Sequence, residues 1–167
     1  VSFPAAAAGG DYFDYVPLLG DRIGFVVADV TGHGIGPALL MAEARAYLRV
    51  LAKRREDLGE ILTRANSVLA EDLSLERYIT MILVALDPDK RELTWSNAGH
   101  PSGLVVGADG SCRMKLKRTG PPLGIREDTE YSARDGLALL SGDIVVLVTD
   151  GFEEALSDDD EFFGVER

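Results

Sequence analysis

The sequence predicts an α+β domain in which layers of antiparallel sheet and of helix share one hydrophobic core. Two stretches repeat apolar residues at helical spacing, and they lie between blocks of short strands that are separated by turns rich in Gly, Pro and Asp. With 167 residues, of which 46% are hydrophobic, the chain can bury one sizeable core and is too short for two. We therefore expect residues 1–167 to form a single domain.

The N-terminal part is predicted to form two strands around an acidic motif. Val1–Ala8 is small and apolar and gives no structural signal, and GGDYFD follows at Gly9–Asp14, where two glycines let the backbone turn tightly. Val16–Leu19 then favours a short strand, Leu19–Arg22 favours a hairpin turn, and a second strand begins at Ile23. Antiparallel pairing would return the carboxylates of GGDYFD to the far end of that second strand.

Two helices are predicted next, followed by strands. One helix is expected over Pro37–Lys53, with the proline in the first turn where its missing N–H does no harm, and another over Asp57–Glu71. Both carry one apolar stripe that would pack on a sheet. The period changes to that of strands at Tyr78. The expected strands are 78–86, 92–96, 103–106, 112–116, 131–134 and 144–149, and the acidic run at 157–167 is expected to be a solvated turn.

The composition disfavours several classes of protein. The net charge is −11 and the sequence pI is about 4.6, which argues against a nucleic-acid or anionic-membrane surface because phosphate contacts need clustered Lys and Arg. No apolar run approaches the roughly 20 residues that span a bilayer, and the N-terminus lacks a basic segment followed by an apolar signal core. Cys112 is the single cysteine and cannot form an internal disulfide. We expect a cytoplasmic protein, without membrane insertion, whose partner is another protein.

Two predicted strands each lead directly to an aspartate. Phe25–Ala28 is apolar without alternation, as in a strand covered on both faces, and precedes Asp29; Ile144–Thr149 likewise precedes Asp150 and Gly151. A single such Asp is more often a turn residue or a helix N-cap. Two of them together with GGDYFD are harder to explain as unrelated turns, because carboxylates that are brought together repel unless a cation lies between them.

The available donor atoms favour Mg²⁺ or Mn²⁺ over zinc. Carboxylate oxygens are hard ligands that suit these two ions. The chain has one Cys and two His, and it contains neither CxxC nor HExxH, so a tetrahedral sulfur or nitrogen site cannot be assembled.

Six motifs follow one another along nearly the whole chain. They are GGDYFD (9–14), ADVTGHG (28–34), YITM (78–81), NAGHP (97–101), GPPLG (120–124) and VTDGFEEA (148–155). Each is weakly specific alone, but in this order they resemble the SpoIIE-type, RsbU-like bacterial members of the PP2C (PPM) family of metal-dependent serine/threonine phosphatases. The resemblance implies a PP2C-like sandwich of two antiparallel β-sheets flanked by helices, in α/β/β/α layers, with two Mn²⁺ or Mg²⁺ ions at one end. It also implies a substrate, phosphoserine or phosphothreonine on a STAS-type anti-anti-sigma protein in a partner-switching pathway.

The resemblance assigns roles to individual residues. Asp29 matches the carboxylate that bridges both metals, assisted by the backbone carbonyl of Val30, and Asp150 matches a ligand of the second metal. Asp11 matches the acidic residue near the first metal, and Asp14 is a further member of that acidic cluster. Asp29 and Asp11 are therefore the predicted catalytic residues, since two metals that share a water can lower its pKa and direct it at phosphorus.

The two histidines, His33 and His100, are candidate proton donors to the leaving serine. The family often carries Lys at the position of His33, so neither histidine is expected to be essential. We expect both to be loop histidines whose ring nitrogens are hydrogen-bonded to the backbone.

The resemblance implies more chain than these 167 residues. The family continues into a further helix and a final strand preceded by an Asp-Asp pair, one of which ligates the second metal, and this sequence stops at Arg167. Either the sequence is a fragment of a longer protein, with room for an upstream sensor domain or a homodimer, or the second metal site is incomplete. The alternative function is a pseudophosphatase, a phosphoprotein-binding or signalling module without turnover; the retained aspartates favour the enzyme.

Overall fold

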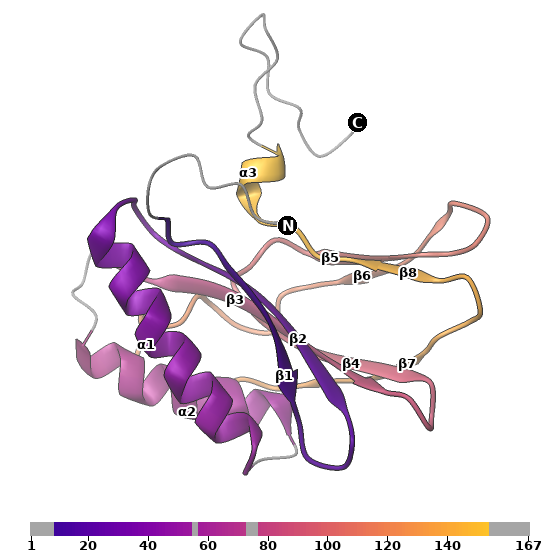
Figure 1. Cartoon of the computed structure of the whole chain (residues 1–167), viewed down its shortest axis with the longest axis horizontal. Coiled ribbons are helices and arrows are strands. Elements are labelled where there is room, and N and C mark those ends of the chain that lie inside the picture. Colours follow the sequence, from indigo (N-terminus) through magenta and orange to yellow (C-terminus); the bar gives the residue numbers. More distant parts are fainter. Residues whose placement is uncertain (1–8, 55–56, 73–76, 154–167) are drawn as a thin grey trace, which may run out of the picture.

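The computed structural model describes residues 9–54, 57–72 and 77–153 as two antiparallel sheets and a layer of two helices (Figure 1). The larger sheet has five strands in the order β1 (Tyr12–Pro17), β2 (Ile23–Val30), β3 (Ile79–Asp87), β4 (Glu92–Ala98) and β7 (Arg134–Ala138). The smaller sheet has three strands in the order β6 (Cys112–Leu116), β5 (Gly103–Val106) and β8 (Ile144–Val146). The helices are α1 (Ile35–Ala52), α2 (Leu58–Asp72) and α3 (Asp150–Glu153).

The five-stranded sheet is covered on both faces, and each face has its own hydrophobic core. Helices α1 and α2 pack on one face, and the three-stranded sheet lies over the other (Figure 1). The α+β class and the sandwich of two antiparallel sheets are thus confirmed. The described residues form one of the two expected helix layers, namely α1 and α2 on the five-stranded sheet.

Strand β2 shows how this layering positions Asp29. Val26, Ala28 and Val30 are buried toward the helices, whereas Phe25 and Val27 alternate with them and pack in the core between the sheets. Successive side chains of a strand point to opposite faces. Asp29 therefore shares the inter-sheet face, and it emerges at the end of the strand where the apolar layer stops.

The two helices bury the apolar stripes that the sequence predicts. Helix α1 begins after Gly34, whose φ of 93° is in the region that favours glycine, and Pro37 lies in its first turn. Helix α2 comes so close to the loop before β7 that a Cβ at Gly59 would lie 2.4 Å from the Tyr131 carbonyl oxygen. The buried apolar side chains of the two helices are Pro37, Met41, Ala44, Leu48, Ala52, Leu58, Ile61, Leu62, Ala65 and Leu69. None of the described helices is long and apolar enough to cross a membrane.

Several predicted strand limits are wrong. Strand β1 begins at Tyr12, inside GGDYFD, and not at Val16, because this motif already pairs with β2 from Tyr12 opposite Ala28. The strand expected at 131–134 is found at 134–138 instead, because the Tyr131 ring is buried and the backbone N–H of Tyr131 donates to the Thr63 hydroxyl of α2. Strand β8 stops at Val146 and does not reach residue 149. The stretches 1–8 and 157–167 lie outside the described residues.

Candidate metal centre

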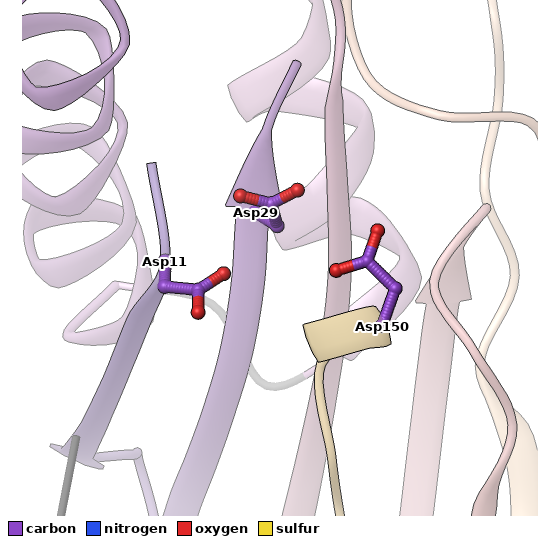
Figure 2. Close-up of side chains that lie close together, drawn as sticks. All are labelled: Asp11, Asp29 and Asp150. Carbon is purple, nitrogen blue, oxygen red and sulfur yellow. The ribbon is translucent and has the colours of Figure 1, made fainter. Parts of the chain in front are cut away.

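Three aspartates from distant parts of the sequence converge at one end of the sandwich (Figure 2). Asp11 lies immediately before β1, Asp29 lies near the end of β2, and Asp150 begins α3. Carboxylate oxygens of the three residues lie within 4.8 Å of one another. The predicted meeting of GGDYFD with the two strand-terminal aspartates is therefore found in the structure for Asp11, Asp29 and Asp150.

The local backbone explains why Asp11 and Asp29 meet. The β1–β2 register pairs Tyr12 with Ala28, so the next residues outward along the two strands are Asp11 and Asp29. A Cβ at Gly10 would lie 2.6 Å from the Val30 carbonyl oxygen and 3.0 Å from Asp29 Oδ1. Only glycine lets the chain pass this closely, and the Val30 carbonyl that was expected to assist the metals lies at this same point.

The electrostatics of the group indicate an unbalanced negative charge. Burial, followed by the negative charges of Asp11 and Asp150, raises the pKa of Asp29 from 3.8 to about 7. The Thr149 hydroxyl donates a hydrogen bond to Asp11 Oδ2 at 3.3 Å. Three convergent carboxylates of this kind form a hard oxygen donor set, which fits Mg²⁺ or Mn²⁺.

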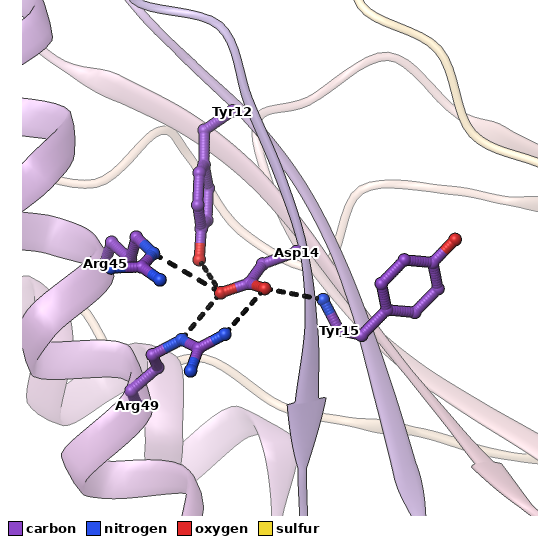
Figure 3. Close-up of polar contacts among 5 residues, drawn as sticks. All are labelled: Tyr12, Asp14, Tyr15, Arg45 and Arg49. Carbon is purple, nitrogen blue, oxygen red and sulfur yellow. Dashed lines mark hydrogen bonds and ion pairs between the residues drawn. The ribbon is translucent and has the colours of Figure 1, made fainter. Parts of the chain in front are cut away.

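Asp14, which the resemblance assigns to the acidic cluster, lies apart from these three aspartates. It contacts Tyr12, Arg45 and Arg49 instead (Figure 3). Its two carboxylate oxygens accept hydrogen bonds of 2.7 Å from Nε and Nη2 of Arg49 on α1, and one of them accepts a bond of 2.6 Å from the Tyr12 hydroxyl. Arg45 Nε lies 3.5 Å away. Hydrogen bonding from Arg49 lowers the pKa of Asp14 to about 2.

The physical reason is the two-residue period of a strand. Asp11 and Asp14 are three residues apart, so their side chains point to opposite faces of the five-stranded sheet. Asp11 points toward the metal centre, and Asp14 points toward α1. The bidentate pair with Arg49 therefore connects α1 to β1 and is separate from the three converging carboxylates.

The two histidines differ sharply. His33 is exposed between β2 and α1. His100 is 1% exposed, and its ring nitrogens lie 2.9 Å from Thr80 Oγ1 and 3.0 Å from the Val148 carbonyl oxygen. Burial lowers the pKa of His100 to about 4, so the ring is neutral at physiological pH and carries no excess proton to give. This agrees with the expectation for His100, because one of its ring nitrogens is hydrogen-bonded to a backbone carbonyl.

A cleft of about 340 Å³ opens beside the carboxylates. Asp29 and Asp150 lie in its wall, and Arg118 contributes a cationic side chain whose Nε donates to the His100 carbonyl oxygen at 3.3 Å. The remaining lining residues are Tyr78, Thr80, Gly99, His100, Pro101 and Pro122. Sequence reasoning did not identify Arg118 or Thr80, although the motifs YITM, NAGHP and GPPLG supply most of this wall.

Comparison with known proteins places the chain in one family. The sequence profile of the family described as Stage II sporulation protein E (SpoIIE) matches residues 20–167. The chain is 30% identical over 154 residues to the phosphoserine phosphatase RsbU of Bacillus subtilis, a match that covers 92% of this chain and 45% of RsbU. It spans less than half the length of the curated relatives that it matches.

Solved structures agree with this assignment. The RsbU and RsbW domains of Rv1364c from Mycobacterium tuberculosis superpose with a TM-score of 0.78 at 34% identity, covering 93% of this chain and 43% of that one. The SiaA-PP2C domain of Pseudomonas aeruginosa gives a TM-score of 0.78 at 25% identity, covering 97% of this chain and 64% of that one. With the profile match over residues 20–167, these findings show that the chain belongs to the SpoIIE family of RsbU-like, PP2C-type serine/threonine phosphatases.

Proposed function

We propose that this domain is a metal-dependent protein phosphatase that hydrolyses phosphoserine or phosphothreonine on a regulatory partner protein. The observation that carries the proposal is the convergence of Asp11, Asp29 and Asp150, whose carboxylate oxygens lie within 4.8 Å of one another beside an open cleft. PP2C-type phosphatases are metal-dependent. The proposal includes two Mn²⁺ or Mg²⁺ ions, for which the described residues supply these three carboxylates.

Each aspartate has a distinct proposed role. Asp29 lies centrally on the inter-sheet face and would contact both ions, with Asp11 on one side, Asp150 on the other and the Val30 carbonyl as a further donor. Divalent ions at this position supply the positive charge that activates a water and neutralises the phosphoryl oxygens. The Thr149 hydroxyl holds Asp11 in place through its hydrogen bond to Oδ2.

The lining of the cleft supports attack by water and not by a side chain. None of the described residues that line it is Ser or Cys, and the Thr80 hydroxyl is already hydrogen-bonded to His100. Arg118 is suitably charged to face a phosphate at the cleft wall. The residues of this chain would therefore bind and orient the phosphoryl group without forming a covalent intermediate.

Hydrolysis of p-nitrophenyl phosphate tests the proposal. We expect turnover that requires Mn²⁺ and is abolished by EDTA. Turnover that persists in excess chelator would rule out the metal mechanism. Binding of Mn²⁺ with no turnover would instead identify the pseudophosphatase, which keeps the fold and signals through a phosphorylated partner.

The proposed substrate is a phosphorylated STAS-type anti-anti-sigma protein in the cytoplasm. Its support is the similarity to RsbU and RsbP, both named phosphoserine phosphatases, together with a net charge of −11 that disfavours nucleic acid as a partner. A phosphorylated STAS protein encoded beside this one should lose its phosphate when mixed with the domain and Mn²⁺, as followed by phosphate-affinity electrophoresis. Retention of the phosphate by several such proteins, alongside turnover of p-nitrophenyl phosphate, would assign the enzyme to another substrate.

A further inference from the structure

His100 connects the two segments that carry Asp29 and Asp150. On one side its Nδ1 lies 2.9 Å from Oγ1 of Thr80, the β3 residue that pairs directly with Asp29 in the β2–β3 register. On the other side its Nε2 lies 3.0 Å from the carbonyl oxygen of Val148, two residues before Asp150. One imidazole thus spans from the five-stranded sheet to the segment that leads from β8 into α3.

A single tautomer satisfies both hydrogen bonds. The Val148 carbonyl can only accept, so Nε2 carries the ring proton and donates it. Nδ1 of the neutral ring then accepts from the Thr80 hydroxyl. His100 is 1% exposed, so little water reaches its ring and the link between the two segments is well defined.

The backbone behind the ring is held as firmly as the ring itself. The His100 N–H donates to Asn97 Oδ1 at 2.8 Å, and the Asn97 side chain in turn donates to the Leu116 carbonyl oxygen at 3.2 Å. Asn97 is fully buried. A Cβ at Gly99 would lie 2.4 Å from Pro122, so this turn admits little displacement. His100 therefore projects from a fixed support.

In the segment that carries Asp150, Leu147 packs in the core between the sheets and the Thr149 hydroxyl donates to Asp11. Among the described residues, strand β8 ends at Val146 and pairs with β5, and α3 is described over Asp150–Glu153. The His100 ring donates to the backbone of this segment at the Val148 carbonyl oxygen. A displacement of this segment would move Asp150 away from Asp29.

We propose that His100 is a positioning residue of the metal centre, which fixes Asp150 relative to Asp29 by bridging Thr80 and Val148. The inference rests on one part of the proposed function, namely that the three aspartates bind a divalent ion. Groups that orient metal ligands from outside the ligand set commonly change metal affinity by about 10–100-fold when they are removed. The effect of losing the bridge should therefore appear first in Mn²⁺ affinity.

Two amide substitutions separate the halves of the bridge. The side-chain amide of Gln reaches the position of Nε2 and can still donate to Val148, whereas the shorter Asn amide reaches only the position of Nδ1. We expect His100→Asn to weaken Mn²⁺ binding about tenfold or more in calorimetric titration. His100→Gln should restore most of the affinity, because it keeps the hydrogen bond to the segment that carries Asp150.

Asn66→Ala is the matched control. Asn66 on α2 is fully buried and bonds three backbone groups of the loop after β6, at Gly124, Arg126 and Glu127, and it does not line the cleft. Its loss should lower the melting temperature as His100→Asn does, while Mn²⁺ affinity stays at the wild-type value.

The outcomes decide between positioning and general stability. Equal losses of Mn²⁺ affinity in His100→Asn and His100→Gln, or an equal loss in Asn66→Ala, would overturn the proposal, as would wild-type affinity in all three. If His100→Asn does not fold, Thr80→Val and Thr80→Ser replace it, with weakened binding expected for Val and wild-type binding for Ser. Since Mn²⁺ binding is measured without substrate, absence of turnover in the wild type would refute the proposed function alone.

Discussion

The substitution Asp29→Asn should make the metal-free domain more stable at neutral and alkaline pH. It keeps the shape of the side chain and removes its charge. In the folded chain Asp29 holds its proton up to about pH 7, whereas a free Asp carboxyl ionises near 3.8. Ionisation of Asp29 therefore opposes folding, and the metal-free wild type loses stability as the pH rises between these two values.

The raised pKa of Asp29 sets the size of the effect. A difference between 3.8 and about 7 corresponds to at most about 4 kcal/mol of unfolding free energy at alkaline pH. Because Asp29 is only half-buried, water screens much of this, and we expect about 1–2 kcal/mol. For a domain of this size that is a rise of roughly 2–8 °C in melting temperature.

Thermal unfolding in EDTA, followed by circular dichroism at about pH 5 and pH 8, measures this directly. The gain in melting temperature over the wild type should be larger at pH 8 than at pH 5. Added Mn²⁺ should stabilise the wild type and leave Asp29→Asn unchanged, which provides the internal control. A fall in the metal-free melting temperature at pH 8 would refute the reasoning, because it would mean that Asp29 is a structural turn or cap residue.

Three further predictions concern neighbouring features. Arg49→Ala should lower the melting temperature by roughly 2–4 °C without weakening Mn²⁺ binding. Because the pKa of Asp14 is lowered to about 2, the Asp14–Arg49 pair stabilises the fold above about pH 4. In acid unfolding between pH 4 and 2, Arg49→Ala should therefore lose less stability than the wild type. Calorimetric titration of the 167-residue chain should show at most one tight Mn²⁺ site, because the three carboxylates that converge among the described residues leave two six-coordinate ions short of ligands. Two tight sites would contradict this. His33→Ala should keep Mn²⁺-dependent turnover of p-nitrophenyl phosphate, and its loss would make His33 a proton donor.

The sequence predicted the meeting of Asp11 with Asp29 because that meeting follows from a local hairpin. The apolar run before Asp29 identified the strand, and the turn at residues 19–22 implied antiparallel pairing, which brings GGDYFD back to the strand end. The same reasoning failed for Asp14, because the first strand was predicted to begin at Val16. A strand that begins at Tyr12 puts Asp11 and Asp14 on opposite faces.

The features that could not be predicted from the sequence depend on contacts between distant residues. NAGHP marks a turn, but nothing in it shows that His100 bonds Thr80 and the Val148 carbonyl, which lies 48 residues away. Tyr131 suggested a strand, whereas its ring is buried and its backbone bonds α2. Such choices are settled by tertiary packing, which local patterns do not encode.

The most direct test of the metal centre is a parallel titration of Mn²⁺ binding and of p-nitrophenyl phosphate turnover, in the wild type and in Asp29→Asn. Calorimetry gives the binding curve, and the rate of p-nitrophenol release gives the activation curve over the same range of Mn²⁺ concentration. The two curves should share a midpoint in the wild type, and both should vanish in Asp29→Asn. Unchanged Mn²⁺ binding in Asp29→Asn, or turnover that survives the substitution, would contradict a phosphatase centre built on Asp11, Asp29 and Asp150.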